Sequence, residues 1–206
     1  MKTGRIAWAA LLAAGGALIG HAALRTEEGR ELDEHLFAAA NAEHGERADR
    51  FFGGVTELGS LYAAAAAAGA LALAGRRREG ARALAGAGAT WLLLQGVKRV
   101  VERPRPFHAN PDGTRRMIAE PHGTSWPSSH PAVLTTFTRV AARELGIGVI
   151  GRVALTGLDA SVAASRVSLG VHYPSDVASG FLFGRAVARL WPRAGARAHR
   201  GRTGPG

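Results

Sequence analysis

Residues 165–176 read SRVSLGVHYPSD, and apolar segments flank this stretch on both sides. Ser165, Arg166, His172 and Asp176 place a hydroxyl, a cation, an imidazole and a carboxylate at fixed spacing. At an average usage of about one residue in twenty, such a four-letter pattern matches by chance at roughly one start position in a hundred thousand. The stretch therefore indicates chemistry as well as a turn between two helices.

Two further patches precede this stretch in the chain. The first runs from Lys98 to Arg105-Pro106, and the second reads PSSH at residues 127–130. The three patches together supply three cations, two imidazoles, hydroxyls and one carboxylate, which suits the cleavage of a phosphoester without a metal ion. No carboxylate cluster with metal-ligand spacing accompanies them. We therefore expect neither a metal nor another cofactor.

The basic and hydroxyl side chains of the patches suit the binding of phosphate. Lys98, Arg105 and Arg166 can neutralise its charge, and arginine offers paired N–H donors that match phosphate oxygens. Ser128 and the backbone N–H groups near Ser129 lie where a helix is expected to begin, and a helix N-terminus favours an anion. Each residue alone is as well explained by a membrane-interface arginine or an ordinary helix cap. Their joint order favours a phosphate site.

The pattern Lys-x6-Arg-Pro, Pro-Ser-x-His and Ser-Arg-x5-His-x3-Asp resembles that of the type 2 phosphatidic acid phosphatases, also called lipid phosphate phosphatases. The likeness is strongest between Lys98 and Asp176. One position departs from it, because Ser129 stands where this family usually has glycine. A serine still offers a backbone N–H to phosphate. The resemblance implies a metal-independent phosphatase.

Two histidines and a carboxylate are the candidate catalytic residues. An imidazole nitrogen can attack phosphorus to form a phosphohistidine, and we expect His172 to be this nucleophile. Pro174 can open a helical turn that lets Asp176 reach the far ring nitrogen and fix its tautomer. His130 is then the general acid for the leaving alkoxide. The chemistry of the residues does not distinguish the two histidines, and this assignment rests on the resemblance.

Composition favours a membrane partner over a nucleic acid. The 206 residues include 26 Lys and Arg against 16 Asp and Glu, for a net charge of +10. Such a charge suits nucleic acid or an anionic membrane. Aromatic residues make up only 6%, without the basic and aromatic alternation that stacks bases, so we expect no nucleic-acid binding. The absence of cysteine excludes disulfides, zinc thiolate sites and cysteine nucleophiles.

Six apolar segments predict an all-α fold, a transmembrane bundle formed by a single domain over residues 1–192. Mean hydropathy is low, but alanine and glycine score weakly and are frequent in packed membrane helices. The first segment is either an anchor or a cleaved signal, and its length favours an anchor. The basic tail 193–206 is expected to be disordered. The expected spans cover residues 6–24, 51–74, 83–101, 131–145, 147–164 and 177–191.

The connections between these segments predict the orientation. Residues 76–78 are three arginines, which places this connection in the cytoplasm. Six spans then put all three patches at the non-cytoplasmic face of a multi-pass protein in the plasma membrane. The acidic connection Arg25 to Arg50 lies on the same side. It is either solvated or contains a short interfacial helix with Leu32, Leu36 and Phe37 on one stripe.

Other functions remain open at the level of sequence. Soluble acid phosphatases and vanadate-binding haloperoxidases are similar at the same motifs, and a non-catalytic basic membrane protein would leave the motifs idle. A site at the bilayer surface suits phosphatidate, phosphatidylglycerophosphate or a polyprenyl diphosphate, with membrane lipids as its surroundings. The resemblance makes undecaprenyl diphosphate and phosphatidate the leading substrates. The sequence does not indicate an oligomeric state.

Overall fold

A computed structural model describes residues 2–193, and every regular element in this range is helical. The expected all-α class is confirmed. The elements are α1 Lys2–Arg25, α2 Glu27–Ala40, α3 Glu46–Thr56, the 3-10 turn Glu57–Gly59, α4 Leu61–Leu73, α5 Arg77–Lys98, α6 Pro106–Ala109, α7 Ser129–Glu144, α8 Val149–Ser168 and α9 Pro174–Leu190. The expected disordered tail falls almost wholly on residues 194–206, outside the described range.

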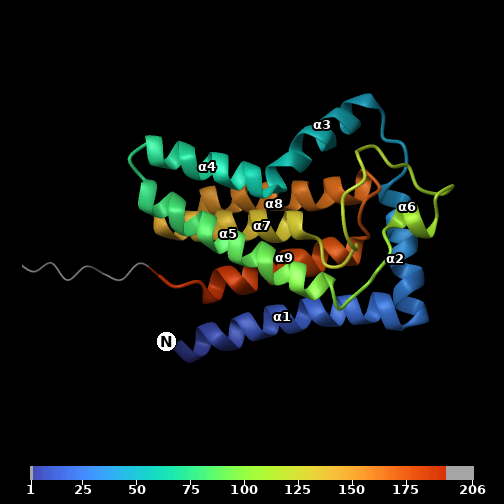
Figure 1. Cartoon of the computed structure of the whole chain (residues 1–206), viewed down its shortest axis with the longest axis horizontal. Coiled ribbons are helices and arrows are strands. Elements are labelled where there is room, and N and C mark those ends of the chain that lie inside the picture. Colours follow the sequence, from blue (N-terminus) through green and yellow to red (C-terminus); the bar gives the residue numbers. More distant parts are fainter. Residues whose placement is uncertain (1, 194–206) are drawn as a thin grey trace, which may run out of the picture.

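Helix α7 lies at the centre of the bundle. It packs against α5, α8 and α9, while α1 packs on α9 and α4 on α5. These helices run along the long axis of the molecule, and α2 lies across one end of it (Figure 1). The core around α7 is built from Val133, Phe137 and Val140, together with alanines of α4, α5 and α9. Small residues let the helix backbones approach closely.

Two glycines set the distance between α7 and α9. A Cβ atom at Gly180 would lie 2.2 Å from the carbonyl oxygen of Ser128, and one at Gly184 would lie 2.5 Å from that of Ala132. Any larger residue would therefore push the two helices apart. This close approach brings the N-terminus of α7, with the PSSH motif, next to the N-terminus of α9, where Asp176 lies.

The expected span 51–74 is not one straight helix, and its crossing of a membrane stays a prediction. The chain breaks there into α3 and α4, which are bent by 70°. The break has a local cause, since Ser60 caps α4 by accepting a hydrogen bond of 3.0 Å from the backbone N–H of Ala63. It places Gly59 against the His130 side chain, where a Cβ would lie 2.8 Å from that of His130. The bend therefore packs against the PSSH motif.

Several expected boundaries also shift. Helix α5 ends at Lys98, where we expected it to continue through residue 101, and α7 begins at Ser129 ahead of Pro131. The region Arg25 to Arg50 contains the amphipathic helix α2, so the fully solvated alternative is wrong there. Its expected stripe is only partly right. Phe37 is buried, whereas Leu32 and Leu36 are exposed.

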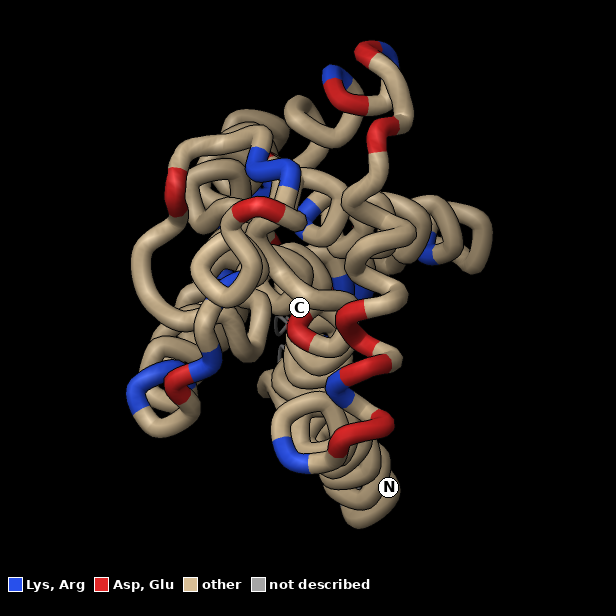
Figure 2. The backbone as a smooth tube through the Cα atoms, turned by 90° about the vertical axis from the view of Figure 1, so that its right-hand side faces the viewer, with Lys and Arg blue, Asp and Glu red and all other residues tan. Residues whose placement is uncertain are grey.

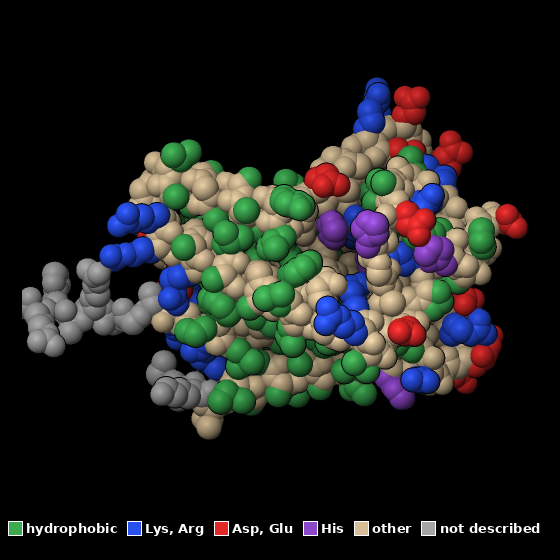
Figure 3. Space-filling view, viewed as in Figure 1, with side chains coloured by type: hydrophobic (Ala, Val, Ile, Leu, Met, Phe, Trp, Pro, Cys, Tyr) green, Lys and Arg blue, Asp and Glu red, His purple; other side chains and the backbone are tan. Residues whose placement is uncertain are grey.

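The surface agrees with a membrane protein, although the count of spans stays a prediction. Within the described range, Thr3–Arg25 is the one helix long and apolar enough to cross a membrane, and the bent pair adds a second if it forms one span. Charged side chains gather toward the two ends of the long axis, and apolar side chains cover much of the surface between them (Figure 3). Exposed large apolar residues include Leu11, Leu18, Leu73, Leu92, Ile150 and Val153.

Candidate active site

The polar residues of the three motifs meet at one end of the bundle. Lys98 ends α5, Ser128 and Ser129 begin α7, and Arg166 lies in the last turn of α8. His172 follows in the turn that leads to α9. Figure 2 views the molecule from this end, with acidic residues along α2 nearby. Residues that lie far apart in the sequence are thus brought to one place by the ends of four helices.

The hydrogen bonds of His172 indicate the position of its proton. Its Nε2 atom lies 3.1 Å from Nη1 of Arg105. A guanidinium can only donate, so Nε2 must accept, and the ring proton resides on Nδ1. Nδ1 lies 3.4 Å from Oδ2 of Asp176. This tautomer leaves the Nε2 lone pair available for attack on phosphorus once a phosphate takes over the contact with Arg105.

Asp176 is held more firmly by other groups than by the histidine. It accepts hydrogen bonds from the Ser125 hydroxyl, from the backbone N–H of Tyr173 at 2.9 Å and from Nη1 of Arg103 at 2.7 Å. The structure brings Asp176 and His172 together, as the motif suggested. The geometry differs from a simple pair. Three other donors hold the carboxylate, and the imidazole makes a longer contact with it.

Arg103 joins two buried carboxylates behind the site. Its guanidinium contacts Asp176 through Nη1 and Asp33 of α2 through Nη2, each at 2.7 Å. It also lies over the ring of Tyr173, with Cζ 4.0 Å from the centroid. Burial alone would lower the pKa of Arg103, but the charges of Asp176 and Asp33 outweigh this effect and raise it. The arginine is thus a permanent cation at the centre of a buried network.

Arg105 and Lys98 are oriented by backbone carbonyl groups of the connecting segments. Arg105 donates to the carbonyl oxygens of Val171 at 2.8 Å and Gly123 at 3.0 Å. Lys98 donates to that of Ser125 at 3.3 Å. These acceptors carry only partial charges, so no carboxylate among residues 2–193 neutralises either cation directly. Arg105 is only 3% exposed, and burial lowers its pKa. The two positive charges repel each other, and an anion bound between Lys98 and Arg105 would offset this repulsion.

Several buried donors of the site have no partner in the described part of the chain. They are the hydroxyls of Ser128 and Ser129 and the Nε–H of Arg166. Arg166 itself is positioned by one bond of 3.0 Å from Nη1 to the Thr56 hydroxyl. Buried donors normally find an acceptor, so these unpaired donors can bind an anion. Phosphate supplies several acceptor oxygens of the required charge.

Both histidines are neutral at neutral pH. Burial, and then the charges of Arg166 and Arg105, lower the pKa of His130 to about 3. The same causes hold the pKa of His172 well below its ordinary value. A neutral His172 is a competent nucleophile. A neutral His130 must gain a proton before it can act as an acid, and a bound phosphate dianion, by offsetting the nearby cations, would raise its pKa.

Sequence reasoning missed four residues of this site. Arg103 had a visible signal, since Arg103-Pro104 repeats the Arg105-Pro106 dipeptide two residues earlier. No signal in the sequence marks the other three residues, Asp33, Thr56 and Ser125, because each resembles the polar residues around it. Among the described residues, no group of three His, Cys, Asp or Glu side chains could hold a metal ion. Metal independence stays a prediction.

The chain matches a known family over more than half of its length. The family model described as the PAP2 superfamily matches residues 79–200. The decaprenylphosphoryl-5-phosphoribose phosphatase of Mycobacterium tuberculosis is 36% identical over 134 residues, which cover 65% of this chain and 71% of that protein. The protein of the same name from Mycolicibacterium smegmatis is 38% identical over 136 residues, which cover 66% and 69%.

Two solved structures share the arrangement of helices. One is the first transmembrane PAP2 type phosphatidylglycerolphosphate phosphatase from Bacillus subtilis, with a TM-score of 0.72 and 23% identity over 88% of this chain and 92% of that one. The other is Aquifex aeolicus LpxE, with a TM-score of 0.69 and 24% identity over 77% and 93%. At these identities the likeness establishes the fold alone.

Proposed function

The chain belongs to the PAP2 superfamily and is a phosphatase, and we propose that it removes the terminal phosphate of a lipid-linked headgroup through a phosphohistidine on His172. We take a prenyl-linked pentose 5-phosphate as the leading substrate. Both relatives are named for decaprenylphosphoryl-5-phosphoribose, and each is more than 30% identical to this chain. Undecaprenyl diphosphate and phosphatidate, which the family resemblance favoured, become the alternatives.

The observation that carries the proposal is the hydrogen bond between His172 and Arg105. It holds an unprotonated Nε2 atom 3.1 Å from a buried guanidinium. A phosphate oxygen bound to Arg105 would therefore bring its phosphorus close to the imidazole lone pair. The unpaired donors of Ser128, Ser129 and Arg166 provide the remaining contacts for the equatorial oxygens. Positioning and charge neutralisation provide most of the catalysis of phosphoryl transfer.

The reaction has two steps. In the first, Nε2 of His172 bonds to phosphorus, the ester P–O bond breaks, and His130 gives a proton to the leaving oxygen. In the second, His130 takes a proton from water, the water oxygen bonds to phosphorus, and the P–N bond breaks to release inorganic phosphate. Lys98, Arg105 and Arg166 neutralise the charge that spreads over the equatorial oxygens. Asp176 stabilises the positive charge that develops on the His172 ring.

We also propose that the chain crosses the plasma membrane several times with this site at the outer face. The three arginines at residues 76–78 lie at the opposite end of α5 from Lys98, and the positive-inside rule places them in the cytoplasm. The apolar surface between the two charged ends supports the placement of this part of the bundle in the hydrocarbon layer of the membrane. Both structural neighbours cover most of this chain, and one is described as transmembrane. Cysteine accessibility of Arg77→Cys and His108→Cys in intact cells would test this orientation.

The experiment that tests this function is phosphate release from lipids in detergent micelles. We expect decaprenylphosphoryl-5-phosphoribose to be cleaved with a kcat/KM at least about tenfold above those of undecaprenyl diphosphate, phosphatidate and phosphatidylglycerophosphate. Activity should persist in excess EDTA. Preference for a diphosphate would overturn the assigned substrate but keep the mechanism. A requirement for added divalent cation would contradict the mechanism itself.

The role of His130 predicts a dependence on the leaving group. His130→Ala should lower kcat by about 10²–10⁴-fold for a lipid alkyl phosphate, whose leaving alkoxide needs a proton. For p-nitrophenyl phosphate the first step, measured as a burst of nitrophenolate, should slow much less, because nitrophenolate leaves without protonation, although hydrolysis of the phosphohistidine would still lack its base. Equal losses in the first step for both substrates would instead indicate that His130 serves to position groups. Thermal unfolding of the variant is the control, since Gly59 packs against this side chain.

A further inference from the structure

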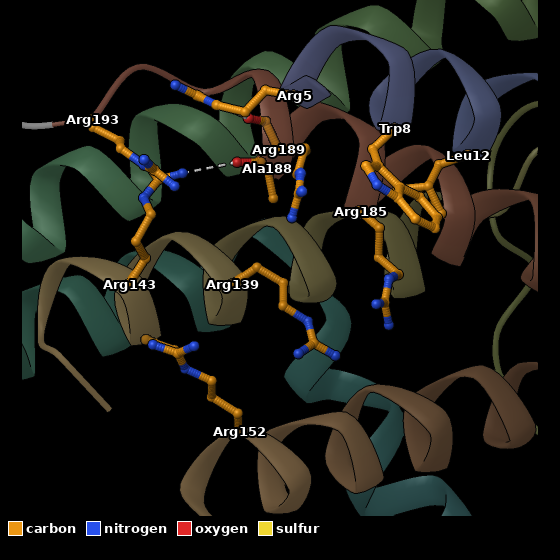
Figure 4. A pocket seen from close by; sticks show the side chains of 11 residues that line it. Arg5, Trp8, Leu12, Arg139, Arg143, Arg152, Arg185, Ala188, Arg189 and Arg193 are labelled. Carbon is orange, nitrogen blue, oxygen red and sulfur yellow. Dashed lines mark hydrogen bonds between the residues drawn. The ribbon is translucent and has the colours of Figure 1, made fainter. Parts of the chain in front are cut away.

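A large cavity lies at the end of the bundle opposite the candidate active site. Its volume is about 650 Å³, and it opens between α1, α7, α8 and α9 (Figure 4). Asp176 and Arg189 are both on α9, thirteen residues apart, so the cavity lies roughly 20 Å along the helix from the catalytic end. The cavity is lined by Arg5, Trp8, Leu12, Arg139, Ala142, Arg143, Arg152, Arg185, Ala188, Arg189 and Arg193.

Two of the lining arginines have a structural role. Arg5 donates to the carbonyl oxygens of Arg189 at 2.8 Å and Trp191 at 3.1 Å. Arg143 donates to that of Ala188 at 3.0 Å. These bonds satisfy carbonyl groups that the C-terminus of α9 would otherwise leave without partners. Helix capping therefore accounts for Arg5 and Arg143, but not for the other arginines.

The remaining positive charge of the cavity is poorly compensated. In the range 2–193, no carboxylate lies within salt-bridge distance of Arg152, Arg185 or Arg189. Arg139 approaches Asp159 only at 3.8 Å, and its buried Nε–H has no hydrogen-bond partner among the described residues. The positive charges of Arg185 and Arg152 also act on Arg139. Such a set of cations at one cavity requires an anion to offset the repulsion.

The side chains are arranged for one polyvalent anion. Figure 4 shows Arg139, Arg152 and Arg185 directed into the space between α7, α8 and α9. They come from three different helices, so a ligand bound to all of them would also tie these helices together. Arginine forms paired hydrogen bonds to phosphate oxygens, which makes a phosphate group the best match.

An apolar edge adds a second requirement to the ligand. Trp8 and Leu12 of α1 line the same cavity, and Trp8 is 58% exposed. Exposed apolar residues of α1 continue along the bundle through Leu11 and Leu18. Tryptophan is favoured at the level of lipid headgroups. A ligand that joins a phosphate to acyl chains would satisfy the arginines and this apolar path together.

We propose that this arginine cavity binds the headgroup of an anionic phospholipid in the leaflet opposite the active site. The bound lipid is a phosphodiester that is not hydrolysed, and it joins α7, α8 and α9 at their far ends. The proposal rests on the chain lying in a membrane, and it does not depend on which phosphate ester the active site cleaves. Free inorganic phosphates share the headgroup chemistry, and the experiment must distinguish the two sources.

Lipid binding by variants tests the proposal. The double variant R152Q/R185Q removes two cavity charges, and R77Q/R78Q removes two exposed charges on α5 outside the cavity. In nanodiscs of phosphatidylcholine with cardiolipin at about one lipid in ten, native mass spectrometry should show cardiolipin held by the unchanged protein. We expect R152Q/R185Q to weaken this binding about 30-fold, at about fivefold for each arginine near the surface. R77Q/R78Q should change it less than about threefold.

Two outcomes would overturn the proposal. Equal losses in both double variants would mean that cardiolipin follows overall charge rather than the cavity. Saturation of the cavity by millimolar pyrophosphate, with cardiolipin no longer bound, would assign the site to a soluble phosphate. Phosphatase activity in neutral detergent, where no anionic lipid is present, should be the same for both variants and the unchanged protein. This activity separates failure of the lipid site from failure of the proposed catalysis.

Discussion

Replacement of His172 by alanine should abolish phosphate release, with a loss on the order of 10⁴-fold or more in kcat. The Nε2 atom at this position is the one imidazole lone pair held against the Arg105 guanidinium in the described structure. In the variant a water molecule would have to attack phosphorus in place of Nε2, and no described side chain holds it in position. The cations alone would then give only residual catalysis. The measurement is phosphate release from a lipid phosphate in micelles.

A matched control distinguishes chemistry from folding. His108→Ala changes a histidine of the same connecting region whose side chain is 52% exposed and bound to Glu120. It should keep activity and the thermal midpoint. Quenching the unchanged protein in alkali during turnover should trap an acid-labile phosphohistidine that His172→Ala lacks. An acid-labile phosphorylated intermediate in His172→Ala, or turnover within about tenfold of that of the unchanged protein, would refute the role of His172.

The site was easier to predict from sequence than the helices that hold it. Its motifs lie at helix ends, where spacing is preserved over short stretches such as residues 165–176. His172 and Asp176 are separated by a single turn, so local geometry alone brings them together. The bend at Glu57–Gly59 contains no proline, and its local signal is the Ser60 cap of α4. Its packing on His130 and Val162 depends on tertiary contacts, which leave no pattern in the local sequence.

Asp33 shows a second limit of sequence reasoning. It lies in a run of acidic residues on α2, and its neighbours Glu31 and Glu34 are exposed, while Asp33 is only 4% exposed. Nothing in the sequence distinguishes a buried carboxylate from a solvated one at this position. Its role appears only when α2 packs across the end of α9 and brings it to Ser175 and Arg103. A pairing over seventy residues depends on the fold.

Replacement of Arg103 by methionine should destabilise the protein by about 3–5 kcal/mol and inactivate what still folds. The substitution leaves Asp33 and Asp176 in the interior without their cation, and an unpaired buried charge is far more costly than a lost surface pair. The side chains of Asp176, Asp33 and Arg103 are 0%, 5% and 6% exposed, so solvent screens them little. The free energy of unfolding in detergent, followed by tryptophan fluorescence, measures the effect.

Two further variants show whether the charge network is the cause. Arg116→Met removes an arginine of the same connecting region from an exposed pair with Glu120, and it should cost less than about 1 kcal/mol. Adding Asp33→Asn to Arg103→Met removes one of the stranded charges, so the double variant should be more stable than Arg103→Met alone. Activity should not return, because Asp176 would still lack the guanidinium that fixes it beside His172. If Arg103→Met were as stable as Arg116→Met, the two carboxylates would have to be satisfied by other groups, and Arg103 would be a peripheral residue of the site.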